Sequence, residues 1–244
     1  MDYAAQRAFL TGRLGLKHAF SLYDACGDER IGYYRLPDGH FVELFPKRAL
    51  RDHGFTGSAD PDGFSFRGGW LGSDACGAPV AAPCVVTDAE GSRWMLDGAG
   101  QCADGLFGVT LRCRCFEQTL AFYRDALGLI IEETSRGALA RVASGQWIEL
   151  IDEPYTAENA IRNRAFSHVA LLTDDIVSVS QRLEARGLGL SHGSSLANPY
   201  FDRPYGELAQ PGSDGSYAFY VMDPEGNDIE AMQYTEASLQ CAHA

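Results

Sequence analysis

The stretch from Tyr217 to Tyr234 constrains the fold most strongly, because it encodes two apolar strands and the turn that joins them. The turn sequence is Asp-Pro-Glu-Gly-Asn, at 223–227. Proline fixes φ at the second turn position, while Gly and Asn tolerate a left-handed backbone. The stretch is therefore predicted to be a β-hairpin.

Glu230 interrupts the apolar pattern of the second strand of this hairpin. Glutamate is mostly exposed in proteins, so one interpretation is a solvated side chain on a two-sided strand. A carboxylate that points into the interior is instead costly unless it is paired or bound to a metal. Glu230 is thus a candidate metal ligand.

An internal repeat supports the second interpretation. Residues 88–96, Asp-Ala-Glu-Gly-Ser-Arg-Trp-Met-Leu, have the same form as the turn and strand at 223–231. The pattern along the chain predicts a repeated strand–helix–strand–strand–strand unit whose last strand carries an acid within an apolar run. These acids are Glu43, Glu149 and Glu230.

The repeat predicts an α+β fold of tandem βαβββ modules that form curled mixed sheets. The Gly- and Asp-rich residues 97–105 are predicted to be a linker between two domains. We expect a degenerate domain at 1–100, which lacks its first strand because Met1 stands where that strand should have ended. The second domain, at 105–235, is expected to carry the site.

Composition excludes several classes of protein. The chain has 244 residues and a formal net charge of −13, which argues against nucleic-acid binding. No apolar run reaches the ~20 residues of a membrane span, and the N-terminus resembles no signal sequence. Seven cysteines without a CxxC pair predict reduced thiols rather than a disulfide framework. We expect a cytoplasmic protein.

Several motifs are similar to those of the vicinal oxygen chelate superfamily, which includes glyoxalase I, bleomycin resistance proteins and extradiol dioxygenases. The motifs lie at 119–123 with 126–129, at 166–171, and at 223–227 with Ile229-Glu230. Residues 15–20 and 41–45 in the N-terminal half look like the same family. The resemblance covers most of the chain and indicates the fold more strongly than the reaction.

The resemblance implies metal ligands on the first and last strand of each module. In the C-terminal half these positions are Gly108, Glu149, His168 and Glu230. Three of the four are competent ligands, and Gly108 would leave a place for water or substrate. One His and two carboxylates suit a single divalent Fe, Mn, Ni or Zn ion.

The same alignment leaves little in the N-terminal half. Phe66 stands at the place of His168 and Met95 at the place of Glu230, so that only Glu43 remains. We therefore expect this half to serve packing or dimerisation, or to cap the cup that the curled sheets of the C-terminal half are expected to form around the site. Other candidates are weaker: His40 is expected at the surface, His192 beside a long loop, and Tyr200, Tyr205 and Tyr220 mainly in the core.

The resemblance implies a metal-dependent lyase or isomerase of glyoxalase type that acts on a small oxygenated substrate. The metal would stabilise an enediolate or similar oxyanion, with Glu149 or Glu230 as general base. One alternative is a metal-free protein that sequesters a small molecule, as bleomycin resistance proteins do. Another is an extradiol-type dioxygenase, although that resemblance calls for a second His. The expected partners are a small-molecule substrate and, as a possibility, a second copy of the chain.

Overall fold

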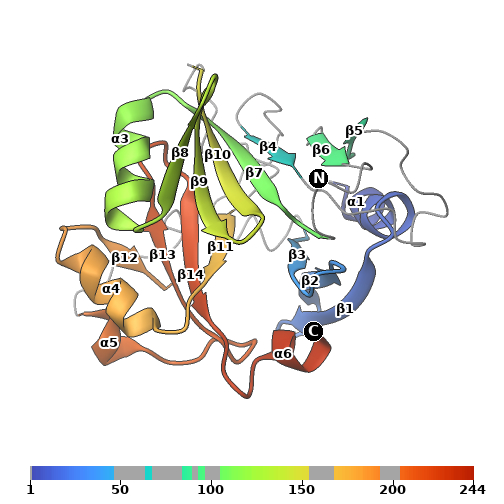
Figure 1. The fold of residues 1–244 in the computed structure, drawn as a ribbon. Coiled ribbons are helices and arrows are strands. Elements are labelled where there is room, and N and C mark those ends of the chain that lie inside the picture. Colours follow the sequence, from blue (N-terminus) through green and yellow to red (C-terminus); the bar gives the residue numbers. More distant parts are fainter. Residues whose placement is uncertain are drawn as a thin grey trace.

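The fold is known from a computed structural model that describes residues 2–46, 64–67, 84–89, 93–96, 105–153, 168–192 and 204–244 (Figure 1). The N-terminal half contains α1 (Tyr3–Ala8), the π-helical turn η1 (Phe9–Arg13), β1 (Lys17–Tyr23), β2 (Glu29–Arg35), β3 (Phe41–Leu44), β4 (Phe64–Arg67), β5 (Cys84–Thr87) and β6 (Arg93–Leu96). The third unit contains β7 (Gly108–Cys113), α3 (Phe116–Ala121), the π-helical turn η3 (Phe122–Ala126), β8 (Ile130–Thr134), β9 (Gly137–Ala143) and β10 (Gln146–Asp152). The last unit contains β11 (His168–Leu172), α4 (Ile176–Glu184), β12 (Leu190–Ser191), α5 (Tyr205–Leu208), β13 (Tyr217–Met222), β14 (Asp228–Gln233) and α6 (Leu239–His243).

Within the residues that the structure describes, the strands form three sheets, ordered β1-β2-β3, β5-β6-β4-β7-β10-β9-β8 and β11-β14-β13-β12. In three of the repeated units the first and last strand pair in parallel: β4 with β6, β7 with β10, and β11 with β14. The remaining strand pairs within each unit are antiparallel. The predicted α+β fold of βαβββ modules with curled mixed sheets is confirmed.

The predicted hairpin is β13–β14, and its turn is fixed by Asp223. One carboxylate oxygen of Asp223 accepts hydrogen bonds from the backbone N–H of Glu225 and Asn227, at 3.0 and 2.7 Å. Gly226 takes the left-handed conformation, with φ of 81°. The turn chemistry in the sequence therefore acts as expected.

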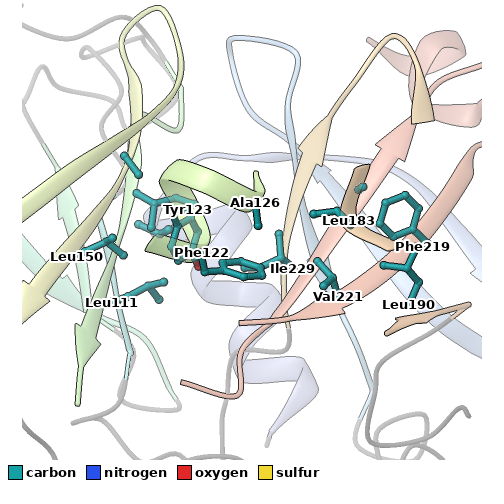
Figure 2. Close-up of a cluster of buried hydrophobic side chains, with 14 of the residues drawn as sticks. Leu111, Phe122, Tyr123, Ala126, Leu150, Leu183, Leu190, Phe219, Val221 and Ile229 are labelled. Atoms are coloured by element: carbon teal, nitrogen blue, oxygen red, sulfur yellow. The ribbon is translucent and has the colours of Figure 1, made fainter. Parts of the chain in front are cut away.

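The C-terminal half is built around one apolar core that two sheets share. Figure 2 shows Leu111 and Leu150 of the seven-stranded sheet on one side of this core and Val221 of the four-stranded sheet on the other, with Tyr123 of η3 among them. Burial of these side chains is the main force that holds the two sheets together. The core residues alternate along each strand, so the intervening residues lie on the outer face of each sheet.

A second core fills the N-terminal half. Leu10 and Leu14 of the first helical segment pack with Leu44 of β3 and with Trp94 of β6. The helical segment thus packs against both the three-stranded sheet and strands β5–β6.

The seven-stranded sheet crosses the predicted domain boundary, because β4 pairs with β7 through Phe66 and Val109. The division into 1–100 and 105–235 stays a prediction.

Among the described residues, no helix is long and apolar enough to cross a membrane. The cysteines in the described part of the chain, Cys26, Cys84, Cys113, Cys115 and Cys241, are all free thiols.

Candidate functional site

Strand alternation places Glu43 and Glu230 on sheet faces that turn away from the two cores. Leu44 belongs to the N-terminal core, so Glu43 lies on the opposite face of β3. Ile229 and Ala231 belong to the C-terminal core, so Glu230 lies on the opposite face of β14. The folded chain brings these two outer faces together.

His168, at the start of β11, lies between the two carboxylates. Its Nε2 atom is 3.1 Å from Oε2 of Glu230 and 3.6 Å from Oε2 of Glu43. The side chains of His168 and Glu230 are 8% and 6% exposed, and that of Glu43 is 19% exposed. The three residues come from β11, β14 and β3, and therefore from both halves of the chain.

The electrostatics of this cluster follow from burial and from the two acids. Burial opposes protonation of His168, but the carboxylates of Glu230 and Glu43 raise its pKa to about 10. Burial also raises the pKa of Glu43, and the neighbouring His168 partly offsets that effect. At neutral pH the cluster therefore contains an imidazolium held between two acids.

Aromatic side chains surround the cluster. The ring of His168 meets Tyr220 edge-to-face at 5.3 Å and Phe45 at 6.0 Å. On the three-stranded sheet, Tyr33 stacks on Phe20 at 4.2 Å. These rings hold the polar groups in a surrounding of low polarity, which strengthens their electrostatic interactions.

Within the described residues, no group of three or more His, Cys, Asp or Glu side chains is arranged so that it could hold a metal ion as it stands. The three side chains are nevertheless of the types that bind divalent transition metals. Two ligands at about 2.1 Å from one metal lie roughly 3.0–3.4 Å apart, close to the two observed separations. Oε2 of Glu230 is buried, and its ion-pair partner is Nε2 of His168 at 3.1 Å. A cation would require the side chains to turn toward a common point.

Glu149, expected as a ligand beside His168 and Glu230, is not brought to them. Ile148 and Leu150 face the C-terminal core, so Glu149 lies on the outer face of the seven-stranded sheet. Glu230 lies on the outer face of the other sheet that shares this core, and the two acids consequently point away from each other. Glu149 instead accepts a 2.7 Å hydrogen bond from the hydroxyl of Thr110 on β7.

Gly108, expected to leave room for water or substrate, is packed against Trp147. A Cβ atom added at Gly108 would lie 2.8 Å from Nε1 and 2.9 Å from the carbonyl oxygen of Trp147. These separations are below van der Waals contact. The space that a ligand side chain would need at this position is occupied by the indole.

The remaining candidates lie apart from the cluster. His40 pairs with Asp38 at 3.0 Å, and its side chain is 40% exposed. Tyr205 is buried in the C-terminal core, with His192 at 6.1 Å from its ring. Met95 pairs with Val85 on β5. The side chain of Phe66 and all of Tyr200 lie outside the described residues.

The sequence model of the Glyoxalase/Bleomycin resistance protein/Dioxygenase superfamily matches residues 105–231, which are 127 of the 244 residues. The chain belongs to this superfamily. A search of curated proteins finds no match.

Solved structures of the superfamily extend the likeness to the N-terminal half. Glyoxalase I from Zea mays superposes with a TM-score of 0.63 at 15% identity, over 95% of this chain and 88% of that one. A point variant of that enzyme gives 0.65 at 16% identity, with the same coverage. Lactoylglutathione lyase from Agrobacterium tumefaciens is 21% identical over 52% of this chain and 92% of its own, with a TM-score of 0.37. At these identities the likeness shows the fold alone.

Sequence reasoning missed that Glu43 belongs with His168 and Glu230, since it assigned each half of the chain its own site. A signal was present in the strand pairs. A tyrosine stands on the strand before each acid of the cluster, and Tyr33 and Tyr220 are the direct cross-strand neighbours of Glu43 and Glu230.

Proposed function

We propose that the chain is a metal-dependent enzyme of its superfamily that acts on a small oxygenated substrate as a lyase or isomerase. Glu43, His168 and Glu230 would hold one divalent cation, with Fe, Mn, Ni and Zn as candidates. The observation that carries the proposal is the convergence of these three buried or half-buried side chains from three strands. Two acids are costly to bury without a cation to balance them.

When bound, the cation would supply Lewis-acid stabilisation of negative charge that develops on substrate oxygens. The chain itself would supply the base. Glu43 is the most exposed of the three, and burial raises the pKa of its carboxyl, so it is the better placed to take a proton from substrate. Glu230, the other expected base, stays a candidate, whereas Glu149 lies on the opposite outer face.

The aromatic rings would bind the apolar part of the substrate and exclude water. Tyr220 and Phe45 contact His168 and border the polar cluster. Exclusion of water strengthens each electrostatic interaction at the reacting atoms. A dioxygenase reaction is less favoured, because the resemblance to extradiol dioxygenases calls for two His ligands and the cluster contains one.

A metal-free binding protein is the second candidate. Its support is that His168, with a pKa raised to about 10, already balances part of the charge of Glu43 and Glu230. A small molecule could then bind at the cluster through the aromatic rings that surround it.

A cytoplasmic location and a homodimer also stay expectations; the free thiols in the described part of the chain support a reducing compartment.

Elemental analysis of the untagged protein and of three matched variants tests the proposal. We expect about one equivalent of a transition metal in the wild type, and its loss in Glu43→Gln and Glu230→Gln. Glu149→Gln replaces a buried acid of the same kind and should keep the metal. Retention in Glu43→Gln with loss in Glu149→Gln would restore the ligand set expected from sequence. No metal in the wild type, even after soaking, would leave the binding protein as the function.

A further inference from the structure

Two tyrosines stand in equivalent positions beside the two acids of the cluster. Tyr33 on β2 is directly opposite Glu43 on β3, and Tyr220 on β13 is directly opposite Glu230 on β14. Direct neighbours in an antiparallel pair lie on the same face, with Cβ atoms about 4.5–5.5 Å apart. Each phenol is therefore on the face of its sheet that carries the acid.

The tyrosine is absent at the same position of the other two units. Leu139 stands opposite Glu149, and Val85 stands opposite Met95. Thus the pairing of tyrosine with glutamate occurs in the two units that build the cluster and in neither of the units at the seven-stranded sheet. An apolar residue would serve packing equally well in all four, so packing alone does not account for the difference.

Both rings are fixed by packing, which fixes the direction of their hydroxyl groups. Tyr33 is 3% exposed and stacks on Phe20 with an interplanar angle of 16°. Tyr220 lies at 88° to the ring of His168. A ring held in this way presents its O–H at a defined point and loses little conformational entropy on forming a hydrogen bond.

The neighbouring acids also affect the pKa of the two phenols. Burial is the larger cause that raises the pKa of Tyr33, and the charge of Glu43 and a side-chain hydrogen bond with it add to the shift. Burial likewise raises the pKa of Tyr220, with Glu230 contributing by charge and by a side-chain hydrogen bond. A tyrosine hydroxyl is protonated at neutral pH, so each phenol can donate a hydrogen bond to the acid beside it.

We propose that Tyr33 and Tyr220 are a matched pair of positioning residues, each of which donates its hydroxyl to the glutamate across the strand and turns that carboxylate toward His168. The proposal rests on the proposed function, in which Glu43 and Glu230 hold a cation. A carboxylate that accepts a hydrogen bond on one oxygen keeps the other for the cation, and such outer partners set the orientation of metal ligands. Oε2 of Glu230, which lies 3.1 Å from Nε2 of His168, is the oxygen nearest the place that the cation would take.

The test measures the affinity of the whole chain for Co²⁺ by competition with a chromogenic chelator. Tyr33→Phe and Tyr220→Phe each remove one hydroxyl and keep the ring. We expect each to weaken Co²⁺ binding about 10- to 100-fold and to change the visible absorption of bound Co²⁺, which reports on ligand geometry. Tyr23→Phe is the matched control, because Tyr23 is on the same sheet and is 62% exposed; it should change neither.

Thermal unfolding of the metal-free proteins separates positioning from folding. Both Phe variants should unfold near the wild-type temperature, since the stacked rings remain. If either variant fails to fold, the other gives an independent measurement of the same effect. Wild-type affinity and spectrum in a folded Phe variant would overturn the positioning role of the tyrosines and leave the proposed function standing. A wild-type protein that binds no Co²⁺ would overturn the proposed function and this inference together.

Discussion

At the scale of single residues, the cluster is unusual because its one base is surrounded by acids. His168 has its pKa raised to about 10 because Glu230 and Glu43 outweigh the effect of burial. The same environment that stabilises an imidazolium also attracts a cation, and the two compete for one place. Protons and metal should therefore exclude each other at this site.

This competition predicts that metal affinity rises with pH. Below the raised pKa, His168 carries a proton that must leave before Nε2 can bind a cation, and the raised pKa of Glu43 acts in the same direction. Apparent affinity should increase about tenfold for each pH unit from neutral pH toward about 10. Competition titrations with Zn²⁺ at several pH values measure the slope. An affinity that is constant from neutral to alkaline pH would contradict the protonated His168.

Gly108 gives a second prediction at this scale. Gly108→Ala should lower the free energy of unfolding by about 1–3 kcal/mol, because the new methyl group would overlap Trp147. Urea denaturation measures the change. Gly12→Ala is the control, since a Cβ there meets nothing within 4 Å and should be neutral or stabilising. Equal stability of the wild type and Gly108→Ala would show that Trp147 moves aside.

At the scale of elements, the β13–β14 turn also fastens the helix of the neighbouring unit. Glu225, at the tip of the turn, accepts hydrogen bonds from the backbone N–H of Cys115 and the hydroxyl of Thr119, at 2.6 and 3.0 Å. Asp223 accepts one from the hydroxyl of Tyr123. The turn thus ties the four-stranded sheet to α3, and through it to the core that both sheets share.

We expect Glu225→Ala to destabilise the protein by about 2–3 kcal/mol, because a buried hydroxyl and a half-buried backbone N–H lose their charged acceptor. Glu117→Ala removes an exposed acid from the same helical turn and should change stability by at most about 0.5 kcal/mol. Chemical denaturation of both variants gives the comparison. Similar values for the two would mean that water replaces Glu225 at the start of α3.

At the scale of the whole molecule, the site depends on which units face each other. The first unit (β1–β3) faces the last unit (β11–β14) through Glu43, His168 and Glu230. The two middle units (β4–β6 and β7–β10) share the seven-stranded sheet through β4 and β7 (Figure 1). Neither half of the sequence carries the complete cluster. The cluster is accordingly a property of the folded chain, not of a domain read from the sequence.

A fragment that contains residues 105–244 tests this dependence. It keeps His168 and Glu230 but lacks Glu43 and Tyr33, so it should bind Zn²⁺ much more weakly than the full chain. Addition of a fragment that contains residues 1–104 should restore binding, since β3 and β4 would return to their places. Full affinity in the C-terminal fragment alone would instead support the site expected within 105–235.

The sequence alone was sufficient to predict the βαβββ units, the turn at 223–227 and the strands that carry Glu43, Glu149 and Glu230. These features follow from local chemistry: the alternation of side chains along a strand and the backbone preferences of Pro, Gly and Asn. Alternation also fixes the face on which each acid lies. It does not say which other sheet that face will meet.

That choice was made by the tertiary structure. The C-terminal core lies between the sheets of Glu149 and Glu230, so its formation turns these two acids outward and apart. The N-terminal core does the same for Glu43, whose sheet then meets the outer face of the last unit. Contacts between residues more than a hundred positions apart decide this arrangement, and no local pattern in the sequence encodes them.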